Sequence, residues 1–259
     1  MKNVALITGA SSGIGKELAH IHAKKGGDMV VVARSSDKLN ELKHELEEKY
    51  KITVMIIAKD LTQLNAAREI YSSVNKEGVE IEYLMNNAGF GGIGKFHERD
   101  WEKDEAMINL NILALTALTR LFLPAMVERN HGRILNVSST ASLMPGPLQA
   151  VYYASKAYVT SFSNAIAEEL SDTNVTVTAL LPGATETEFG AISGMDKTEL
   201  FDKTASAETV ANKGYSAMMK GNLNVIAGLP RSLKIMMKLI PFMPKKAMLK
   251  QVRKMQEEK

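Results

Sequence analysis

The sequence has 259 residues, 45% hydrophobic and 24% charged, a composition typical of a soluble globular protein with a large core. It contains no cysteine, which excludes disulfides and cysteine-based zinc or iron–sulfur sites. The net charge of +3 is uneven, because residues 229–259 hold nine basic and two acidic residues, whereas the preceding chain holds 23 basic and 27 acidic ones. A mildly acidic body gives no electrostatic support for nucleic-acid binding, so we expect none.

The amino-terminal residues lead directly into an apolar strand, with no pattern of a secretory signal. No segment contains the roughly 20 uninterrupted apolar residues of a membrane-spanning helix. Together with the absence of cysteine, these features lead us to expect a cytoplasmic protein.

Seven apolar, β-branched runs alternate with amphipathic, charged segments. Runs of this kind predict a parallel sheet that is covered by helices on both faces. We therefore predict an α/β, Rossmann-like doubly wound fold of about seven strands, with one domain over residues 1–228. Residues 229–259 are predicted to be a basic, Met-rich extension packed on that domain or on a neighbouring subunit. The seven runs cover residues 4–7, 29–32, 52–57, 81–85, 133–137, 175–181 and 223–227.

A glycine-rich turn, Thr8 to Gly15, follows the first run and reads T-G-A-S-S-G-I-G. Glycines there let the backbone approach a diphosphate, whose charge is met by the first amides of the next helix. A P-loop would need glycine at Ala10 and a hydroxyl residue at Glu17, so that motif is excluded. Residues 9–13 also fit the nucleophile elbow of hydrolases, although that elbow normally follows several strands; a purely structural turn is the other alternative.

The end of the second run carries Arg34 and Ser35, where a fold that prefers NAD has an acidic residue for the ribose 2′-hydroxyl. No carboxylate is there to repel a 2′-phosphate, and Arg34 is placed to bind one. NADP(H) is therefore favoured over NAD(H). The alternative is that Arg34 is a solvated residue at a strand end.

Polar residues also follow the third and fourth runs, as Asp60-Leu61 and as Asn86-Asn87-Ala88-Gly89. Both sites lie at the carboxyl ends of strands, where ligands bind in open α/β sheets. Asp60 suits either recognition of an adenine or a local turn or helix cap.

A tyrosine and a lysine stand four residues apart in Asn136 to Lys156, after a strand end that carries serines. On a helix, Tyr152 and Lys156 project from one face, and a neighbouring ammonium favours the phenolate, which lowers the pKa of a phenol. The pair therefore suits proton transfer near neutral pH. The same spacing also occurs in ordinary surface contacts of a helix.

Five motifs occur along the chain in an order that resembles the short-chain dehydrogenase/reductase family. They are T-G-A-S-S-G-I-G from Thr8, N-N-A-G from Asn86, N-V-S-S from Asn136, Y-Y-A-S-K from Tyr152 and P-G-A-T-E-T from Pro182. The resemblance covers residues 1 to about 220 and implies the fold predicted above.

The resemblance also implies four catalytic residues. Tyr152 would be the general acid in carbonyl reduction and the base in alcohol oxidation. Lys156 would lower the pKa of this tyrosine and hold the nicotinamide ribose. Ser139 would bind the substrate oxygen, with Ser138 structural, and Asn111 would kink a helix and hold a water that relays protons to Lys156. Tyr153 and Asn109 compete with Tyr152 and Asn111, because only the motif register separates them.

The cofactor implied by the resemblance is NADP(H), with no metal. The diphosphate and adenosine side would use Gly9, Ser11, Ser12, Gly13, Ile14 and Gly15, with Arg34 and Ser35 at the 2′-phosphate. Asp60 and Leu61 would flank the adenine, close to Asn87, Ala88 and Gly89. The nicotinamide half would contact Tyr152, Lys156, Pro182, Gly183, Thr185 and Thr187.

The predicted function is an NADP(H)-dependent oxidoreductase that transfers a hydride between NADPH and a carbonyl or alcohol. The candidate lining of the substrate pocket is largely apolar and therefore suggests a hydrophobic ketone or aldehyde. These residues are Phe90, Ala141, Leu143, Met144, Gln149 and Phe189. The alternative from another class is a redox-silent NADP(H)-binding sensor.

Two predictions concern partners other than the substrate. The resemblance suggests a homodimer or a homotetramer. Residues 230–246 mix Met and Leu with cations and three prolines, so this segment suits packing on its own domain, packing at a subunit boundary or contact with an acidic membrane surface.

Overall fold

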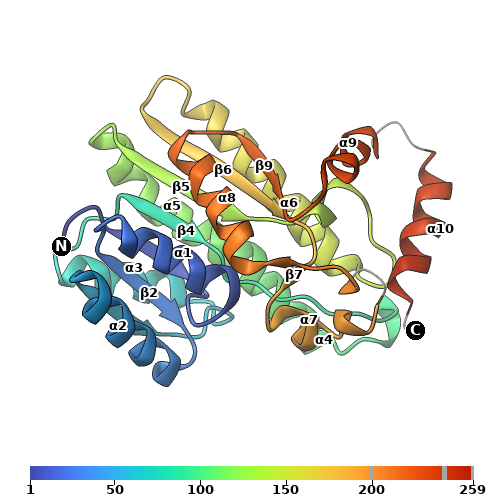
Figure 1. Ribbon diagram of the computed structural model, residues 1–259, viewed down its shortest axis with the longest axis horizontal. Coiled ribbons are helices and arrows are strands. Elements are labelled where there is room, and N and C mark those ends of the chain that lie inside the picture. The colour runs from blue at the N-terminus through green and yellow to red at the C-terminus, as the bar shows by residue number, and fades with distance from the viewer. Residues whose placement is uncertain (199–200, 241–243, 258–259) are drawn as a thin grey trace.

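The computed structural model describes residues 1–198, 201–240 and 244–257 (Figure 1). Its main element is a seven-stranded parallel sheet in the order β3-β2-β1-β4-β5-β6-β9. This arrangement confirms the predicted Rossmann-like α/β fold. The strands are β1 (Ala5–Thr8), β2 (Met29–Ala33), β3 (Val54–Ala58), β4 (Tyr83–Asn86), β5 (Gly132–Val137), β6 (Val175–Pro182) and β9 (Asn224–Ala227). A separate short pair joins β7 (Thr185–Glu186) to β8 (Ala205–Ser206).

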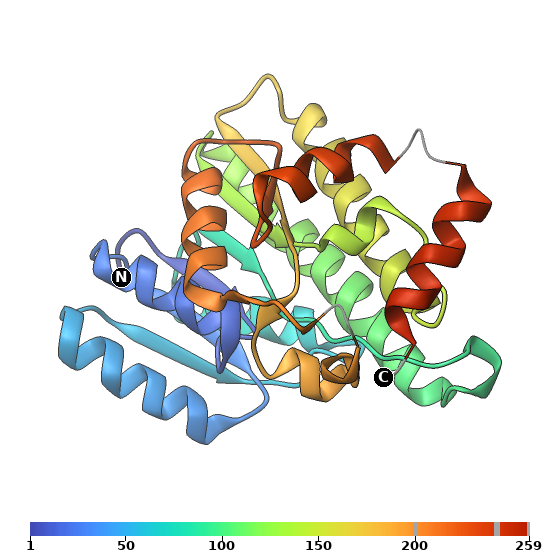
Figure 2. The same ribbon diagram turned by 45° about the vertical axis from the view of Figure 1, so that its right-hand side comes forward.

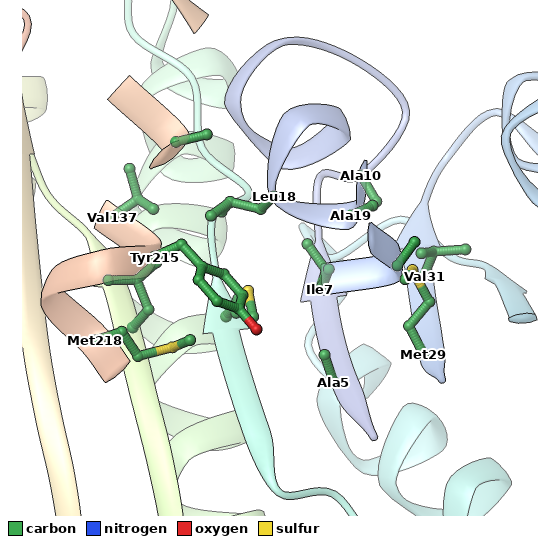
Figure 3. Close-up of a cluster of buried hydrophobic side chains, with 14 of the residues drawn as sticks. Ala5, Ile7, Ala10, Leu18, Ala19, Met29, Val31, Val137, Tyr215 and Met218 are labelled. Carbon is green, nitrogen blue, oxygen red and sulfur yellow. The ribbon is translucent and has the colours of Figure 1, made fainter. Parts of the chain in front are cut away.

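Helices bury both faces of the sheet, and successive residues of β1 point to opposite faces. Ala5 and Ile7 belong to one core cluster, whereas Leu6 belongs to the other. The first cluster is covered by α1 (Gly13–Lys24), α2 (Ser36–Tyr50) and α8 (Ala207–Met219), and Figure 3 shows its side chains between the helices and the sheet. The second is covered by α3 (Ala66–Lys76), α5 (Leu115–Glu128) and α6 (Ala150–Glu169).

The strand order reverses at the boundary between β1 and β4. The chain builds outward from β1 through β2 to β3, then returns to place β4 on the other side of β1. In parallel sheets, ligands bind at the carboxyl ends of the strands at such a switch point. The glycine-rich turn after β1 and the N-N-A-G motif after β4 therefore meet at this boundary.

A long helical segment over residues 101–128 contains a change of helical pitch. It consists of α4 (Trp101–Ile108), a π-helical stretch over Asn109–Ala114, and α5. By length and composition this is the one helix of the described chain that could cross a membrane, but α5 packs against the sheet through Leu118, Phe122 and Met126. The segment thus serves as a core helix, and its π-helical stretch buries Asn111.

The remaining helices follow β6 and β9. The helix α7 (Phe189–Ser193) lies between β7 and β8, and α9 (Arg231–Leu239) and α10 (Lys245–Gln256) complete the described chain. Figure 2 shows α9 and α10, in red, on the side of the molecule away from α2. Residues 241–243 of the predicted basic segment lie outside the described residues.

A buried histidine connects α1 to the amino-terminal residues and to α8. The Nε2 atom of His22 lies 2.8 Å from the Asn3 carbonyl oxygen, and Nδ1 lies 3.0 Å from the Tyr215 hydroxyl. A carbonyl can only accept a hydrogen bond, so Nε2 carries the proton of the neutral ring. Burial lowers the pKa of His22 because the charged imidazolium is poorly solvated there.

This environment predicts a pH-dependent free energy of unfolding. The unfolded chain binds a proton at His22 below a pH of about 6.5, whereas the folded chain resists it, so stability falls as the pH drops through that range. The His22→Phe variant should lose this contribution to the slope of the unfolding free energy against pH. The loss of its hydrogen bonds should lower the unfolding free energy by about 1–3 kcal/mol at pH 8. Urea unfolding between pH 8 and pH 5.5 measures both effects. The exposed His97→Phe should keep the wild-type slope; an unchanged slope in His22→Phe would contradict the prediction.

Candidate active site

The glycine-rich turn forms a cradle that larger residues could not build. Gly9 and Gly13 have φ angles of +65° and +52°, in the left-handed region. A Cβ atom on Gly15 would lie 2.2 Å from the carbonyl oxygen of Gly9. Ser12 is the N-cap residue of α1, but its side chain does not cap the helix. The turn thus has the shape and the available first-turn amides that a diphosphate requires.

The N-N-A-G motif fixes this turn from the neighbouring strand. The side-chain amide of Asn87 donates to the carbonyl oxygens of Thr8 at 2.9 Å and Gly9 at 3.2 Å. The hydroxyl of Thr8 accepts from the backbone amides of Asn87 and Ala88, each at 3.0 Å. Asn87 therefore has a structural task, which is to hold the glycine-rich turn in place.

The candidate residues for the adenosine end lie in two different environments. Arg34 is exposed directly after β2, and the Ser35 hydroxyl caps α2 by accepting from the Lys38 amide. The Asp60 carboxylate accepts from the amide and the hydroxyl of Thr62, at 2.9 and 2.8 Å, which is the local turn contact considered as one alternative. Leu61 is buried in the hydrophobic core, so its side chain packs inward.

The helix α6 brings Tyr152 and Lys156 to the end of β5. The Tyr152 hydroxyl lies near Ser139, and the Lys156 ammonium donates to the Val137 carbonyl at 2.9 Å. The ammonium lies 5.9 Å from the centroid of the Tyr152 ring. The neighbouring Ser138 is structural, because its hydroxyl donates to the Lys156 carbonyl at 2.8 Å. The structure therefore brings together the serine, tyrosine and lysine that the motifs selected.

The neighbouring candidates are separated by their hydrogen bonds. The Tyr153 hydroxyl accepts from the Gln256 amide at 2.7 Å, so it faces α10 and not Ser139. Asn111 is buried, and its amide donates to the Phe90 carbonyl and the Ser155 hydroxyl, each at 3.0 Å. A Cβ atom on Gly89 would lie 3.0 Å from Asn111 Oδ1 and 3.3 Å from Lys156 Nζ, so both polar groups converge on Gly89.

The charge states of the pair differ from the sequence-based expectation. Burial raises the pKa of Tyr152 to about 12, with a smaller opposing effect from the hydrogen bond to Ser139. Burial also lowers the pKa of Lys156 to about 8. The tyrosine pKa thus shifts in the direction opposite to the prediction, because burial disfavours the charged phenolate. Tyr152 is protonated at neutral pH and suited to donate a proton.

The segment after β6 lies against the glycine-rich turn. A Cβ atom on Gly13 would be 2.7 Å from the Thr187 side chain, so this segment closes on the turn. The Thr185 hydroxyl donates to the Gly183 carbonyl at 2.9 Å, and the Thr140 hydroxyl donates to the Pro182 carbonyl at 3.2 Å. The predicted nicotinamide-side residues therefore lie next to the predicted diphosphate site.

An apolar cluster surrounds Tyr152. Five of the six predicted lining residues take part in it: Phe90, Ala141, Leu143, Met144 and Phe189. Gln149 is 1% exposed, and neither polar atom of its side chain has a hydrogen-bond partner. Sequence reasoning missed the remaining members, which are Met107, Val151, Tyr153, Met237, Ile240, Met248 and Val252. The spacing of Met248, Val252 and Gln256 along one face of α10 was the available signal.

In the part of the chain that the structure describes, neither the cavity away from this site nor the acidic and histidine side chains suggests a second functional site. A cavity of about 330 Å³ near Tyr71, Ile81 and Phe122 lies at the amino ends of the strands and contains none of the predicted site residues. Among the described residues, no group of three or more His, Asp or Glu side chains could hold a metal ion.

Comparisons with known proteins identify the family of this chain. Residues 3–197 match the model of the short chain dehydrogenase family. The chain belongs to this family. As a short-chain dehydrogenase it is an oxidoreductase, and the residues of its motifs meet at the carboxyl end of the sheet as described above.

Several characterised members are similar over most of this chain. The human very-long-chain 3-oxoacyl-CoA reductase is 33% identical over 253 residues, which cover 91% of this chain and 78% of that enzyme. The rat enzyme is 37% identical, with 69% of this chain matched to 58% of its own length. The NADP-dependent 3-hydroxy acid dehydrogenase of Schizosaccharomyces pombe is 35% identical, covering 72% of this chain and 73% of that one.

Solved structures give the same picture. A short-chain dehydrogenase from Sphingobium yanoikuyae in complex with NADPH is 31% identical, with a TM-score of 0.80, and the match covers 86% of this chain and 87% of that one. A 7beta-hydroxysteroid dehydrogenase is 26% identical, with a TM-score of 0.85 over 96% of both chains. These likenesses support the observed fold.

Proposed function

We propose that this NADP(H)-dependent oxidoreductase reduces the carbonyl group of a hydrophobic ketone or aldehyde, with Asn111, Ser139, Tyr152 and Lys156 as its catalytic residues. The observation that carries the proposal is the position of the buried Tyr152 hydroxyl, which lies near Ser139 and Lys156 within an apolar cluster. The neutral phenol is the form that can donate a proton to the carbonyl oxygen as hydride arrives.

The glycine cradle fits the diphosphate of NADP(H), and Arg34 next to the α2 amino terminus suits its 2′-phosphate. When bound, NADPH supplies the hydride. The Ser139 hydroxyl orients the substrate carbonyl oxygen by a hydrogen bond, and Tyr152 donates its proton to that oxygen as negative charge develops there. The Lys156 ammonium, held by the Val137 carbonyl, stabilises the phenolate left behind. Asn111 holds Phe90 and Ser155 in position beside Lys156.

The apolar lining supports a substrate whose carbonyl is attached to an extended hydrocarbon group. The names of the human and fission-yeast relatives describe 3-oxoacyl and 3-hydroxy acid compounds, in which an oxygen function lies on an acyl chain. A redox-silent sensor fits less well, because a sensor has no need of a buried proton donor next to a serine and a lysine.

Tyr152→Phe tests the proposed acid. The variant should lose turnover by at least about 100-fold, since proton donation contributes on the order of 10²–10⁴ to such reactions. Its dissociation constant for NADPH should change little, because the ring remains. Oxidation of NADPH with a series of ketones and aldehydes of increasing alkyl length measures the first effect, and calorimetry measures the second.

The matched control for that experiment is Tyr153→Phe, which removes the hydrogen bond to Gln256 and should retain turnover. Full activity of Tyr152→Phe would refute the assignment. Binding of NADPH without turnover of any carbonyl by the wild type would favour the sensor.

We also propose that the protein forms a homodimer or a homotetramer through the outer face of α5 and α6. Leu113, in the π-helical stretch just before α5, and Tyr158 of α6 are 48% and 38% exposed, and the Tyr158 ring stacks on Phe162 at a centroid distance of 5.7 Å. The Thr116 and Tyr158 hydroxyls lie 3.0 Å apart and join the two helices. Exposed apolar and aromatic side chains on a rigid two-helix face suit an isologous contact.

Leu113→Asp should weaken this association, because it would bury a carboxylate in the contact. Light scattering should give a dimer or tetramer mass for the wild type and a smaller mass for the variant at the same concentration. Leu64→Asp, at a position that is 80% exposed outside these helices, is the control and should keep the wild-type mass. A monomeric wild type would contradict the proposal.

A separate proposal concerns peripheral membrane contact through α9. The helix α10 packs on its own domain, but α9 exposes Ile235 and Leu239 by 63% and 54%. Residues 231–256 contain eight basic and no acidic residues. Apolar side chains beside cations suit the surface of an acidic membrane.

Flotation with vesicles tests this contact. Wild-type protein should float with vesicles that contain anionic lipid and remain behind with neutral ones, and Ile235→Asp should reduce flotation severalfold. Leu64→Asp again serves as the control. Equal flotation of wild type and Ile235→Asp would refute a membrane role for α9.

A further inference from the structure

An ion pair connects two segments that lie 150 residues apart in sequence. The Lys38 ammonium, in the first turn of α2, is 2.7 Å from the carboxylate of Glu188, which immediately precedes α7. The Glu188 carboxylate also lies near Ser12 of the glycine-rich turn. This pair therefore spans the region between the first turn of α2 and the diphosphate cradle.

The contact belongs to a larger closure of the same segment. Thr187, the residue before Glu188, packs so closely on Gly13 that a Cβ atom there would be 2.7 Å away. The chain from Thr187 to Glu188 thus touches the glycine-rich turn with one residue and α2 with the next. Glu188 brings a negative charge close to the cradle, where a diphosphate would also carry negative charge.

Lys38 also lies close to the candidate site for the 2′-phosphate. Its backbone amide donates to the Ser35 hydroxyl, so the lysine lies one turn beyond Arg34 and Ser35, the candidates for the 2′-phosphate. A phosphate carries close to two negative charges at neutral pH and attracts an ammonium more strongly than a single carboxylate does. Both members of the ion pair are about half exposed, at 48% and 55%, and such pairs contribute only about 0–1 kcal/mol. A phosphate could therefore displace Glu188.

We propose that Lys38 is a specificity residue for the 2′-phosphate of NADP(H) and that Glu188 competes with this phosphate for it. Binding of NADP(H) transfers the Lys38 ammonium from the carboxylate to the phosphate. Binding of NAD(H), which has no 2′-phosphate, leaves the ion pair intact. This inference rests on the assignment of NADP(H) as the cofactor, but it does not depend on the identity of the carbonyl substrate.

The test measures dissociation constants for NADPH and NADH by calorimetry in Lys38→Met, Glu188→Gln and the double variant. Lys38→Met should weaken NADPH about tenfold and change NADH less than about twofold, because a single charge-assisted contact is lost. Glu188→Gln should tighten NADPH relative to NADH by about two- to fivefold, as expected when a weak exposed competitor is removed. In the Lys38→Met background, Glu188→Gln should leave the NADPH to NADH ratio unchanged.

The ratio of the two constants is the decisive quantity, because removing a carboxylate near the cradle affects the diphosphate of both cofactors alike. Lys43→Met and Glu47→Gln provide matched controls, since this second pair lies on the same helix at 3.7 Å and carries the same charges. Both controls should leave the ratio unchanged.

Three outcomes would overturn the proposal: equal weakening of NADPH and NADH in Lys38→Met, an unchanged ratio in Glu188→Gln, or the same effect of Glu188→Gln with and without Lys38. Failure of the wild type to bind NADPH would instead overturn the cofactor assignment, and with it this inference.

Discussion

The close approach of the glycine-rich turn to the end of β4 is the constraint on which the rest of the site depends. Gly15 and Gly9 come so near each other that a side chain on Gly15 would collide with the Gly9 carbonyl, and Asn87 ties the turn to the neighbouring strand with two hydrogen bonds. The Asn87 side chain thus holds in place a turn whose close backbone approach requires glycines, which have no side chain. Because this junction lies where the strand order reverses, it also brings the ends of β1 and β4 to one edge.

The chemistry next to this junction is governed by burial more than by the pairing of charges. Lys156 lies on the same face of α6 as Tyr152, yet its ammonium donates to the Val137 carbonyl. Burial raises the pKa of Tyr152 and lowers that of Lys156, so it favours the neutral form of each residue. A neutral phenol is the form that can give up a proton to a carbonyl oxygen. Burial raises the free energy of the phenolate, but it also strengthens the attraction between the phenolate and the Lys156 ammonium, since charges interact more strongly where water is excluded.

The carboxyl-terminal helices contribute several side chains to the apolar cluster around Tyr152. The family match ends at residue 197, whereas Met248 and Val252 of α10 and Ile240 after α9 complete the cluster. Gln256 reaches the hydroxyl of Tyr153, the immediate neighbour of the proposed acid. A segment beyond the matched motifs therefore forms one side of the apolar cluster around the proposed acid.

Much of the architecture followed from local patterns. Seven apolar runs indicated the seven strands of the sheet, because runs buried on both faces differ in period from the amphipathic helices between them. The ordered motifs indicated the family and selected Tyr152 over Tyr153. Only the tertiary structure determined the raised pKa of Tyr152, the packing of α10 and the pairing of Lys38 with Glu188. These features depend on desolvation and on contacts between residues far apart in the chain, which no local pattern encodes.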